Sequence, residues 1–182
     1  MQSSLALDDL ELWLEEGYPQ SVRTAYLILG NRLDAEDAVQ EAFLRAWKFR
    51  HSLSKESSFK PWLYRVVVNT CNSKLRKEIP LRERRSNEEE LENIEVRDNV
   101  PERIAVAHDV LSALKDLPAH LRVVVVLHYY ADLSEREIAI AIDRKQGTVK
   151  SRLNEARRRL ALHPALRSEV SGVSNSDEEI TG

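Results

Sequence analysis

The sequence predicts an all-α protein built from two small helical domains that a flexible linker joins. Apolar residues recur at intervals of three and four along most of the chain, which is the spacing of an amphipathic helix. The 182 residues include only 5 Gly and 6 Pro, too few for the tight turns that an all-β fold needs. Residues 79–103 are highly charged and contain few apolar side chains, so we expect them to form the linker.

The N-terminal part has a first predicted helix over VRTAYLIL at residues 22–29. Its apolar side chains have helical spacing, and Gly30 with Asn31 provides a C-terminal stop. We expect Asp34 to cap the next helix, which continues to about Phe49. The apolar stripe of that helix consists of Ala35, Val39, Phe43 and Ala46.

A third helix is predicted at Pro61, because proline suits the first turn of a helix. It continues through WLYRVVVNTCNSKLRK. The run from Val66 to Val68 favours a β-strand, which is the local alternative. The length of the segment, the absence of neighbouring strands and the proline at its start favour the helix.

The C-terminal part is predicted to begin near Glu102 with IAVAHDVLSALKDL, a helix that ends before Pro118. HLRVVVVLHYYADL follows, a short segment before Ser134 that is rich in β-branched residues. Ser134 and Glu137 form the capping-box pattern S-x-x-E that opens EREIAIAID. A turn over 143–146 leads into the basic segment QGTVKSRLNEARRRL. Two short helices joined by a tight turn, the second of them basic, predict a helix-turn-helix.

Charge is segregated along the chain, although the formal net charge is only -3. Residues 51–85 carry nine Lys or Arg against three acidic residues, and residues 121–163 carry nine against five. Residues 1–50 and 86–120 are acidic, with nine Asp or Glu in each. Two basic blocks separated by an acidic stretch suggest two anion-binding surfaces, with ordinary solvated helix faces as the alternative.

The basic segment has an apolar stripe and a cationic exterior. The stripe consists of Val149, Leu153, Ala156 and Leu160, and we expect it to contact Ile138 and Ile142 of the preceding helix. In a major groove, Arg and Lys can reach guanine O6 and N7, and Asn can pair with adenine. A helix with these residues outside is therefore predicted to bind DNA, with a solvated basic surface helix as the alternative.

Position along the basic helix suggests the role of each residue, because the N-terminal half of a recognition helix usually reaches base edges. We assign base readout to Lys150, Ser151, Arg152 and Asn154, with Glu155 marginal. Phosphate contacts are assigned to Arg157, Arg158 and Arg159. Thr148 is predicted either as an N-cap or as a site where free backbone amides bind a phosphate.

Four stretches fit the pattern of one protein family: LGNRLDAEDAVQEAFLRAW, FKPWLYRVVVN, LPAHLRVVVVLHYYADLSEREIAIAI and GTVKSRLNEARRRL. In their order and spacing the chain resembles bacterial RNA polymerase sigma factors of the extracytoplasmic-function (ECF) group of the sigma-70 family. The resemblance implies region 2 over residues 1–78, the linker over 79–103 and region 4 over 104–163. Residues 164–182 are polar and acidic, and we expect a disordered tail.

The resemblance implies a factor that binds core RNA polymerase and directs promoter-specific transcription initiation, as an alternative, stress-responsive factor. Region 2 is expected to bind the polymerase and to recognise and melt the -10 element, and region 4 to read the -35 element. The implied partners are core RNA polymerase, through its β′ clamp helices and β flap, promoter DNA and an anti-sigma factor. No cofactor or metal is expected.

The resemblance also assigns residues of region 2. Recognition of the -10 element is expected to involve Phe59, Trp62, Tyr64, Arg65, Asn69, Lys74, Arg76 and Lys77. Core polymerase binding is expected to involve Asp34, Glu36, Asp37, Gln40, Glu41 and Leu44. The alternative role of Trp62 is core packing. The alternative for Asn69 is an exposed helical residue without a function, and helix capping alone could explain Asp34 and Asp37.

Two departures from the family pattern concern the helix-turn-helix. Asp143 and Lys145 stand in the turn where many relatives have Gly and Pro, and Asp tolerates the left-handed conformation better than most residues. Glu155 stands where relatives are often basic. It could accept a hydrogen bond from cytosine N4, repel a phosphate, or pair with Arg158 or Arg159, and we favour the intrahelical pair.

Other function classes have little support in the sequence. The five His are scattered, the single cysteine Cys71 has no evident base, and no phosphate loop or metal-ligand spacing is present, so we expect no catalytic residues. No apolar run approaches the roughly 20 residues of a membrane span, and the acidic N-terminus lacks a secretory signal, so we expect a cytoplasmic protein. An autonomous helix-turn-helix repressor or activator is the alternative function, but it leaves the pattern over residues 34–77 unused.

Overall fold

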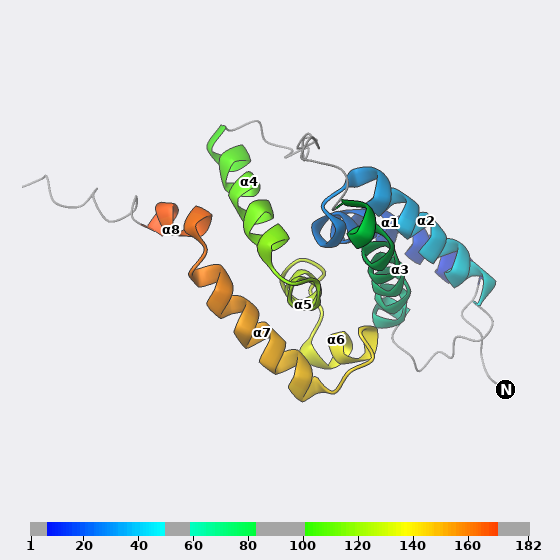
Figure 1. The fold of residues 1–182 in the computed structure, drawn as a ribbon. Coiled ribbons are helices and arrows are strands. Elements are labelled where there is room, and N and C mark those ends of the chain that lie inside the picture. The colour runs from blue at the N-terminus through cyan, green and yellow to red at the C-terminus, as the bar shows by residue number, and fades with distance from the viewer. Residues whose placement is uncertain (1–6, 50–58, 83–100, 171–182) are drawn as a thin grey trace, which may run out of the picture.

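The computed structural model describes residues 7–49, 59–82 and 101–170, and within these ranges all regular secondary structure is helical (Figure 1). The prediction of an all-α protein is therefore confirmed. The N-terminal unit consists of α1 (Leu7–Leu29), α2 (Arg32–Lys48) and α3 (Phe59–Arg82). The C-terminal unit consists of α4 (Pro101–Asp116), α5 (Ala119–Tyr129), α6 (Glu135–Ala141), α7 (Gln146–Ala161) and α8 (Pro164–Val170).

The turn between α1 and α2 is made by two residues of special chemistry. Gly30 adopts φ +76°, which only glycine reaches at little cost, and its N–H donates to the Tyr26 carbonyl at 2.7 Å. The side chain of Asn31 then caps α2 by accepting from the Asp34 N–H at 3.0 Å. The prediction that Asp34 is the cap was wrong. Asp34 lies in the first turn of α2, where its charge favours the helix dipole.

Helix α3 begins two residues before Pro61, which keeps this proline in the first turn as predicted. Val67 and Val68 lie inside α3 and are buried, so burial against α1 and α2 outweighs their β-preference. The helix extends to Arg82 and α4 begins at Pro101, so the segment expected as linker is helical at both ends. Its remaining residues lie outside the described ranges.

Helix α5 contains four consecutive valines and is nevertheless helical. Val123, Val124, Val125 and Val126 are all buried, as are Leu121 and Leu127. A helix that is apolar on all sides suits a central position, and α5 contacts α1, α6 and α7. Contacts between distant segments thus decide the conformation of a stretch whose composition favours strands.

Helix α6 is opened by the predicted capping box. The Glu137 N–H donates to Ser134 Oγ at 3.3 Å, while the Ser134 N–H donates to Glu137 Oε2 at 2.9 Å. The hydrogen bonds from Ser134 hold the pKa of the Glu137 carboxyl below its usual value. The turn after α6 places Asp143 at φ +54°, so the prediction that an aspartate tolerates this left-handed position is also confirmed.

Helix α7 places its apolar stripe against α5 and α6. Val149, Leu153 and Ala156 are fully buried, and Leu160 packs at the edge of the same core. The predicted partner Ile138 is also fully buried there, with Ile142 partly buried. Figure 1 shows α7 at the edge of the molecule, and its basic residues, including Lys150 and Arg158, are exposed.

Helix α8 corrects the expectation of a disordered tail beginning at residue 164. Pro164–Val170 forms two turns that contact α4. His163 precedes it, and its Nε2 lies 3.0 Å from the Asp116 carboxylate at the end of α4. The rest of the expected tail lies outside the described ranges.

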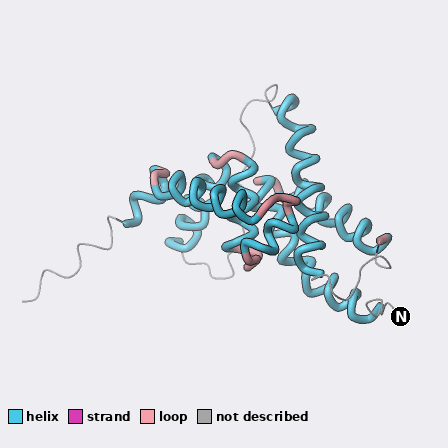
Figure 2. The backbone as a smooth tube through the Cα atoms, turned by 90° about the horizontal axis from the view of Figure 1, so that it is seen from below, coloured by secondary structure: helices cyan, strands magenta, loops and turns pink. Residues whose placement is uncertain are grey.

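The two units share one hydrophobic core. Buried residues of α1, α3, α5, α6 and α7 belong to the same cluster, which includes Ile28, Val68, Leu127, Ile138 and Leu153. Short loops connect the helices within the described ranges, as Figure 2 shows in pink, and α3 contacts α6 while α1 contacts α5. The chain therefore combines two helical units in a single packed body.

Candidate nucleic-acid interface

The outward side of α7 carries most of the residues predicted to read DNA. Lys150, Ser151 and Asn154 are exposed on the N-terminal half of the helix, as base readout requires. The Ser151 hydroxyl donates to the Thr148 carbonyl at 3.0 Å. Thr148 itself is not the N-cap. Lys145 holds that position and makes no side-chain cap, so this alternative for Thr148 was wrong.

Arg152 is the half-buried member of this set. Burial, and secondarily repulsion from Arg144, lowers the pKa of its guanidinium, although arginine stays charged at physiological pH. Arg144 lies in the turn before α7 and donates to the Asp143 carbonyl at 2.7 Å. Two guanidiniums that approach each other in this way favour an anion between or beside them. Arg144 was not predicted, because its role depends on the turn that brings it close to Arg152.

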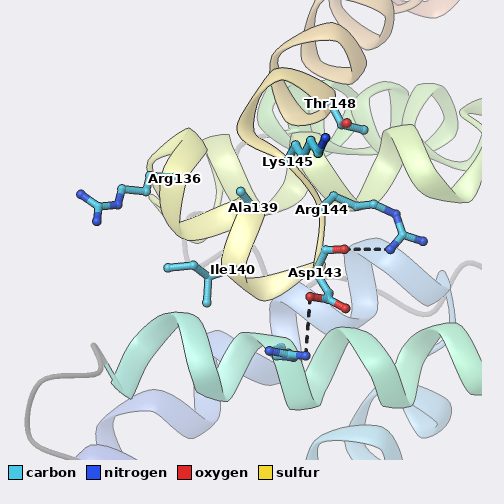
Figure 3. A pocket seen from close by; sticks show the side chains of 8 residues that line it. Arg136, Ala139, Ile140, Asp143, Arg144, Lys145 and Thr148 are labelled. Atoms are coloured by element: carbon cyan, nitrogen blue, oxygen red, sulfur yellow. Dashed lines mark hydrogen bonds and ion pairs between the residues drawn. The ribbon is translucent and has the colours of Figure 1, made fainter.

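A shallow groove of about 840 Å³ lies beside this pair, between α3, α6 and the start of α7 (Figure 3). Cations dominate its walls, and the only acidic residue among them is Asp143. In Figure 3 the side chain of Ile140 extends from α6 towards α3. The lining residues are Arg65, Arg136, Ala139, Ile140, Asp143, Arg144, Lys145 and Thr148.

Glu155 pairs within its own helix, as predicted. Arg158 donates to the Glu155 carboxylate at 2.6 and 3.1 Å, and Arg159 donates to its other oxygen at 2.7 Å. Hydrogen bonds from Arg159 and Arg158 hold the pKa of the Glu155 carboxyl below its usual range. Two of the three arginines assigned to phosphates are thus engaged by one acid.

The third of these arginines is held by a residue that sequence analysis missed. Arg157 donates from Nε to the Tyr129 hydroxyl at 2.7 Å, and its guanidinium carbon lies 5.7 Å from the ring centroid. Arg157 also donates to Asn154 Oδ1 at 3.3 Å. Tyr129, 61% exposed at the end of α5, therefore positions Arg157, which in turn contacts Asn154. No pattern within α5 signals this role, because the contact joins residues 28 positions apart.

The aromatic residues of α3 mostly belong to the core. Phe59 is 7% and Tyr64 is 3% exposed, so their burial does not fit the expectation that they contact the -10 element. Burial raises the pKa of the Tyr64 hydroxyl. Trp62 is half-buried, and its ring centroid lies 5.9 Å from that of Phe59. Trp62 therefore contributes to packing and keeps some exposed surface, and its role at the -10 element stays a prediction.

The polar residues predicted on α3 differ in exposure, and several have partners. Asn69 and Arg76 are exposed, and Arg76 donates to Ser73 Oγ at 3.4 Å. Lys74 forms an ion pair with Asp37 of α2. Arg65 lies 3.8 Å from the Asp143 carboxylate of the other unit. Lys77 belongs to α3, but its side chain lies outside the described residues.

Helix α2 presents the residues predicted to contact the polymerase. Leu33 and Leu44 are each 72% exposed, and Gln40 is exposed between them on the same helix face. Glu36 pairs with Arg32 and Glu41 with Arg45, both four residues apart. Leu33 was not predicted. The sequence around Leu33 does not indicate whether this leucine is buried or exposed. Its place on the exposed face becomes clear only because the opposite stripe of α2 is buried.

Within the described ranges, neither a reactive cysteine nor a metal site competes with the surfaces described above. Burial raises the pKa of the Cys71 thiol to about 12, which keeps it protonated and unreactive. No group of three or more His, Cys, Asp or Glu able to hold a metal ion occurs among these residues. None of the described helices is long and apolar enough to span a membrane.

Two protein families match the chain, one in each unit. Residues 13–79 match Sigma-70 region 2, and residues 107–160 match Sigma-70, region 4. The ECF RNA polymerase sigma factor SigE of Mycolicibacterium smegmatis is 31% identical over 156 residues, covering 84% of this chain and 60% of that relative. The ECF RNA polymerase sigma-E factor of Escherichia coli K12 is 32% identical over 138 residues, covering 68% of this chain and 70% of that relative.

Solved structures show the same fold. The sigma factor RpoE of Bartonella quintana, in a complex with the anti-sigma factor NepR, aligns with a TM-score of 0.73 and 24% identity. The alignment covers 92% of this chain and 99% of that one. CnrH, in a complex with the cytosolic domain of CnrY, aligns with a TM-score of 0.64 and 20% identity, over 93% of this chain and 92% of CnrH.

Proposed function

The chain belongs to the ECF group of the sigma-70 family of RNA polymerase sigma factors, and on that premise we propose that it brings core RNA polymerase to particular promoters. The observation that carries the proposal is the presence of both family regions, in order, in one chain. An autonomous repressor needs the helix-turn-helix but has no use for the exposed face of α2. We further propose an alternative, stress-responsive factor that acts in the cytoplasm and catalyses no reaction itself.

Region 4 reads the -35 element through α7 in this proposal. Lys150, Ser151, Arg152 and Asn154 face the base edges, and Arg157 and Arg158 meet phosphates. Glu155 acts indirectly by holding Arg158 and Arg159. Arg144 adds a phosphate contact from the turn, supported by its proximity to Arg152.

Region 2 captures the -10 element through the exposed side of α3. Asn69 contacts a base edge, Trp62 offers a partly exposed ring, and Arg65, Lys74, Arg76 and Lys77 follow the backbone. Phe59 and Tyr64 support α3 from within the core. Lys74 must exchange its partner Asp37 for a phosphate to take part, so its contribution is smaller than that of Arg76.

Core RNA polymerase binds the exposed face of α2. Leu33 and Leu44 supply apolar area, and Gln40, Glu41 and Glu36 supply polar contacts around it. Asp34 and Asp37 contribute charge at the edge of this face. We assign this surface to the β′ clamp helices and region 4 to the β flap.

An anti-sigma factor restrains the protein in our proposal. The similarity to a sigma factor described in a complex with an anti-sigma factor supports it. For the domain division we propose region 2 over residues 1–78 with α3 continuing to Arg82, a linker, region 4 over 104–163, and a final segment from 164 that starts with α8.

A binding selection tests the function against its alternative. The full chain is incubated with a randomised duplex library, alone and with core polymerase, and bound sequences are recovered. The proposal expects enrichment of two spaced elements only when core polymerase is present. Strong enrichment of a single operator by the free protein would instead favour an autonomous repressor or activator.

A further inference from the structure

Tyr129 links the last turn of α5 to the exposed side of α7 through Arg157. Arg157 Nε donates to the Tyr129 hydroxyl at 2.7 Å, and the guanidinium carbon lies 5.7 Å from the ring centroid, within the range of a cation–π contact. The residues of α5 from Val123 to Leu127 are buried, so the core fixes the backbone that carries Tyr129. The ring itself is 61% exposed and contributes little to that core. Its place suits the positioning of a surface neighbour.

His128 supports the Tyr129 ring. The two ring centroids lie 4.8 Å apart with an angle of 74° between the planes, the edge-to-face arrangement that aromatic pairs favour. His128 Nδ1 lies 3.1 Å from the Leu133 carbonyl, and because a carbonyl only accepts, this nitrogen carries a proton and donates it. The imidazole is thereby tied to the loop after α5. The Tyr129 hydroxyl is therefore presented to α7 from a defined position.

Arg157 in turn orients the side-chain amide of Asn154. Arg157 Nη1 donates to Asn154 Oδ1 at 3.3 Å, across the three positions that put both residues on one face of α7. Arginine carries N–H donors and no acceptor, so this contact requires the amide oxygen, and not the amide nitrogen, to face Arg157. A distance of 3.3 Å is long for such a bond. The contact therefore depends on Arg157 being held in place, and the shorter bond to Tyr129 holds it.

The orientation of an amide decides which base edges it can read. Adenine presents the N6–H donor beside the N7 acceptor, whereas guanine presents the acceptors O6 and N7. A fixed amide offers its oxygen and its N–H groups in one order, while a free amide can turn over and fit either edge. The oxygen of Asn154 has two lone pairs, so it can accept from Arg157 and from a base together. Whatever fixes this amide therefore narrows the base preference of Asn154.

The orienting role of Arg157 is compatible with the phosphate contact assigned to it. Glu155 engages the next two arginines of the run, Arg158 and Arg159, whereas Tyr129 engages Arg157. The bonds to Tyr129 and Asn154 use Nε and Nη1 of Arg157, and a guanidinium has further N–H groups. Arg157 can therefore contact a phosphate while it stays bound to the Tyr129 hydroxyl.

We propose that Tyr129 is a positioning residue that sets the base preference of α7: its hydroxyl holds Arg157, and Arg157 fixes the amide of Asn154. That Asn154 faces a base of the -35 element rests on the proposed function, whereas the contacts among the three residues in the free protein do not. Removal of the Tyr129 hydroxyl alone should relax specificity at the base pair that Asn154 faces. Affinity averaged over all sequences should change little, because each side chain assigned to the DNA is still present.

Nuclear magnetic resonance of the free full-length protein tests the contacts without DNA. We expect the Arg157 Nε–H to exchange slowly with water. Tyr129→Phe should accelerate that exchange and shift the signals of the Asn154 side-chain amide. Tyr130→Phe removes a hydroxyl from the next residue, which packs against the core, and as the matched control it should alter neither observable. Fast exchange of the Arg157 Nε–H in the wild-type protein, or an Asn154 amide that ignores Tyr129→Phe, would overturn the proposal.

Base preference on DNA tests the specificity claim. The full-length protein with core polymerase is titrated onto a promoter recovered in the binding selection and onto variants with every other base at each position of the -35 element. Tyr129→Phe should reduce the preference at one position by about 5-fold to 10-fold. Asn154→Ala should reduce it at the same position, and Tyr129→Phe added to Asn154→Ala should reduce it no further. Tyr130→Phe should keep the wild-type preference.

Two other results on DNA would overturn the specificity claim, and they have different meanings. A uniform loss of affinity at every position, with a shallower salt dependence, would show that the Tyr129 hydroxyl itself contacts a phosphate. A wild-type complex that prefers no -35 sequence would contradict the proposed function and, with it, the specificity claim. The resonance experiment on the free protein would still separate that failure from a failure of the contacts among Tyr129, Arg157 and Asn154.

Discussion

Individual side chains on α7 differ in how freely they can meet DNA. Arg152 is half-buried and is repelled by Arg144, so an incoming phosphate or guanine relieves repulsion as well as adding a contact. Arg158 and Arg159 both donate hydrogen bonds to Glu155. To contact a phosphate, each must either break these bonds or keep the negative Glu155 close to the DNA. Residues that look equivalent in the run RRR therefore have unequal access to the nucleic acid.

Arg152→Ala should weaken use of the -35 element while leaving affinity for core polymerase intact. A guanidinium that reads a base edge contributes about 1–3 kcal/mol of discrimination, so promoter binding by the complex with core polymerase should fall about 10-fold to 100-fold. Binding to promoters with an intact or a scrambled -35 element measures the effect. An equal loss of binding to core polymerase would contradict the assignment.

Glu155→Gln should strengthen binding to DNA of any sequence and steepen its salt dependence. Release of two arginines allows up to two more phosphate contacts, so the slope of log K against log salt should grow in magnitude by about 1–2. Titration of the polymerase complex onto promoter DNA over a range of salt concentrations measures this slope. Glu135→Gln, the same change on α6, is the control. An unchanged slope for Glu155→Gln would contradict the prediction, because it would show that Arg158 and Arg159 already contact phosphates when Glu155 is present.

Whole helices show which features are set locally and which depend on distant contacts. The start of α6 is local, because Ser134 and Glu137 complete their hydrogen bonds within four residues. The helical state of α5 is not local, since its valines favour strands and are helical only because α1, α6 and α7 surround them. The exposed apolar residues of α2, Leu33 and Leu44, likewise depend on tertiary contacts, because burial of the opposite side of the helix leaves them on the surface.

Ser134→Ala should destabilise the protein by about 1 kcal/mol, because the N–H of Glu137 loses its acceptor. Chemical denaturation followed by circular dichroism measures the free energy of unfolding. Ser134→Asp should recover most of the loss, since aspartate is an equally good cap. A loss that aspartate does not repair would point to packing of the serine instead of capping.

Leu44→Asp should reduce affinity for core polymerase by at least 10-fold, because a charge replaces apolar area on the exposed α2 face. Its stability should change by less than about 0.5 kcal/mol, as expected for an exposed position. Leu44→Ala should have a smaller effect of the same sign. Wild-type affinity of Leu44→Asp for core polymerase, measured by fluorescence titration, would place the interface elsewhere.

At the scale of the whole molecule, sequence patterns predicted the features within each helix far better than the contacts between helices. The α7 stripe, the capping box and the Glu155 pair all follow from spacings within one helix, and all three were predicted correctly. Phe59 and Tyr64 were expected to contact the -10 element but are buried, because an aromatic residue beside a basic block has the same local pattern whether it is buried or exposed. The pairs Arg157–Tyr129 and Lys74–Asp37 join distant segments, and no periodicity reveals them.

The arrangement of the units was the largest difference from expectation. A charged linker predicts independent domains, whereas the structure has one core through both units. The charge pattern of a linker carries no information about that contact. It arises because α1 and α3 present apolar surface that α5 and α6 complement, a property of two surfaces that are each assembled from several segments.

The central claim is that this chain confers promoter specificity on core RNA polymerase. The most direct test is in-vitro transcription from a library of promoter sequences, with start sites mapped for core polymerase alone and with the full-length protein. We predict new start sites that share two conserved elements upstream, and their loss with Leu44→Asp. The same start sites with and without the protein would contradict the claim.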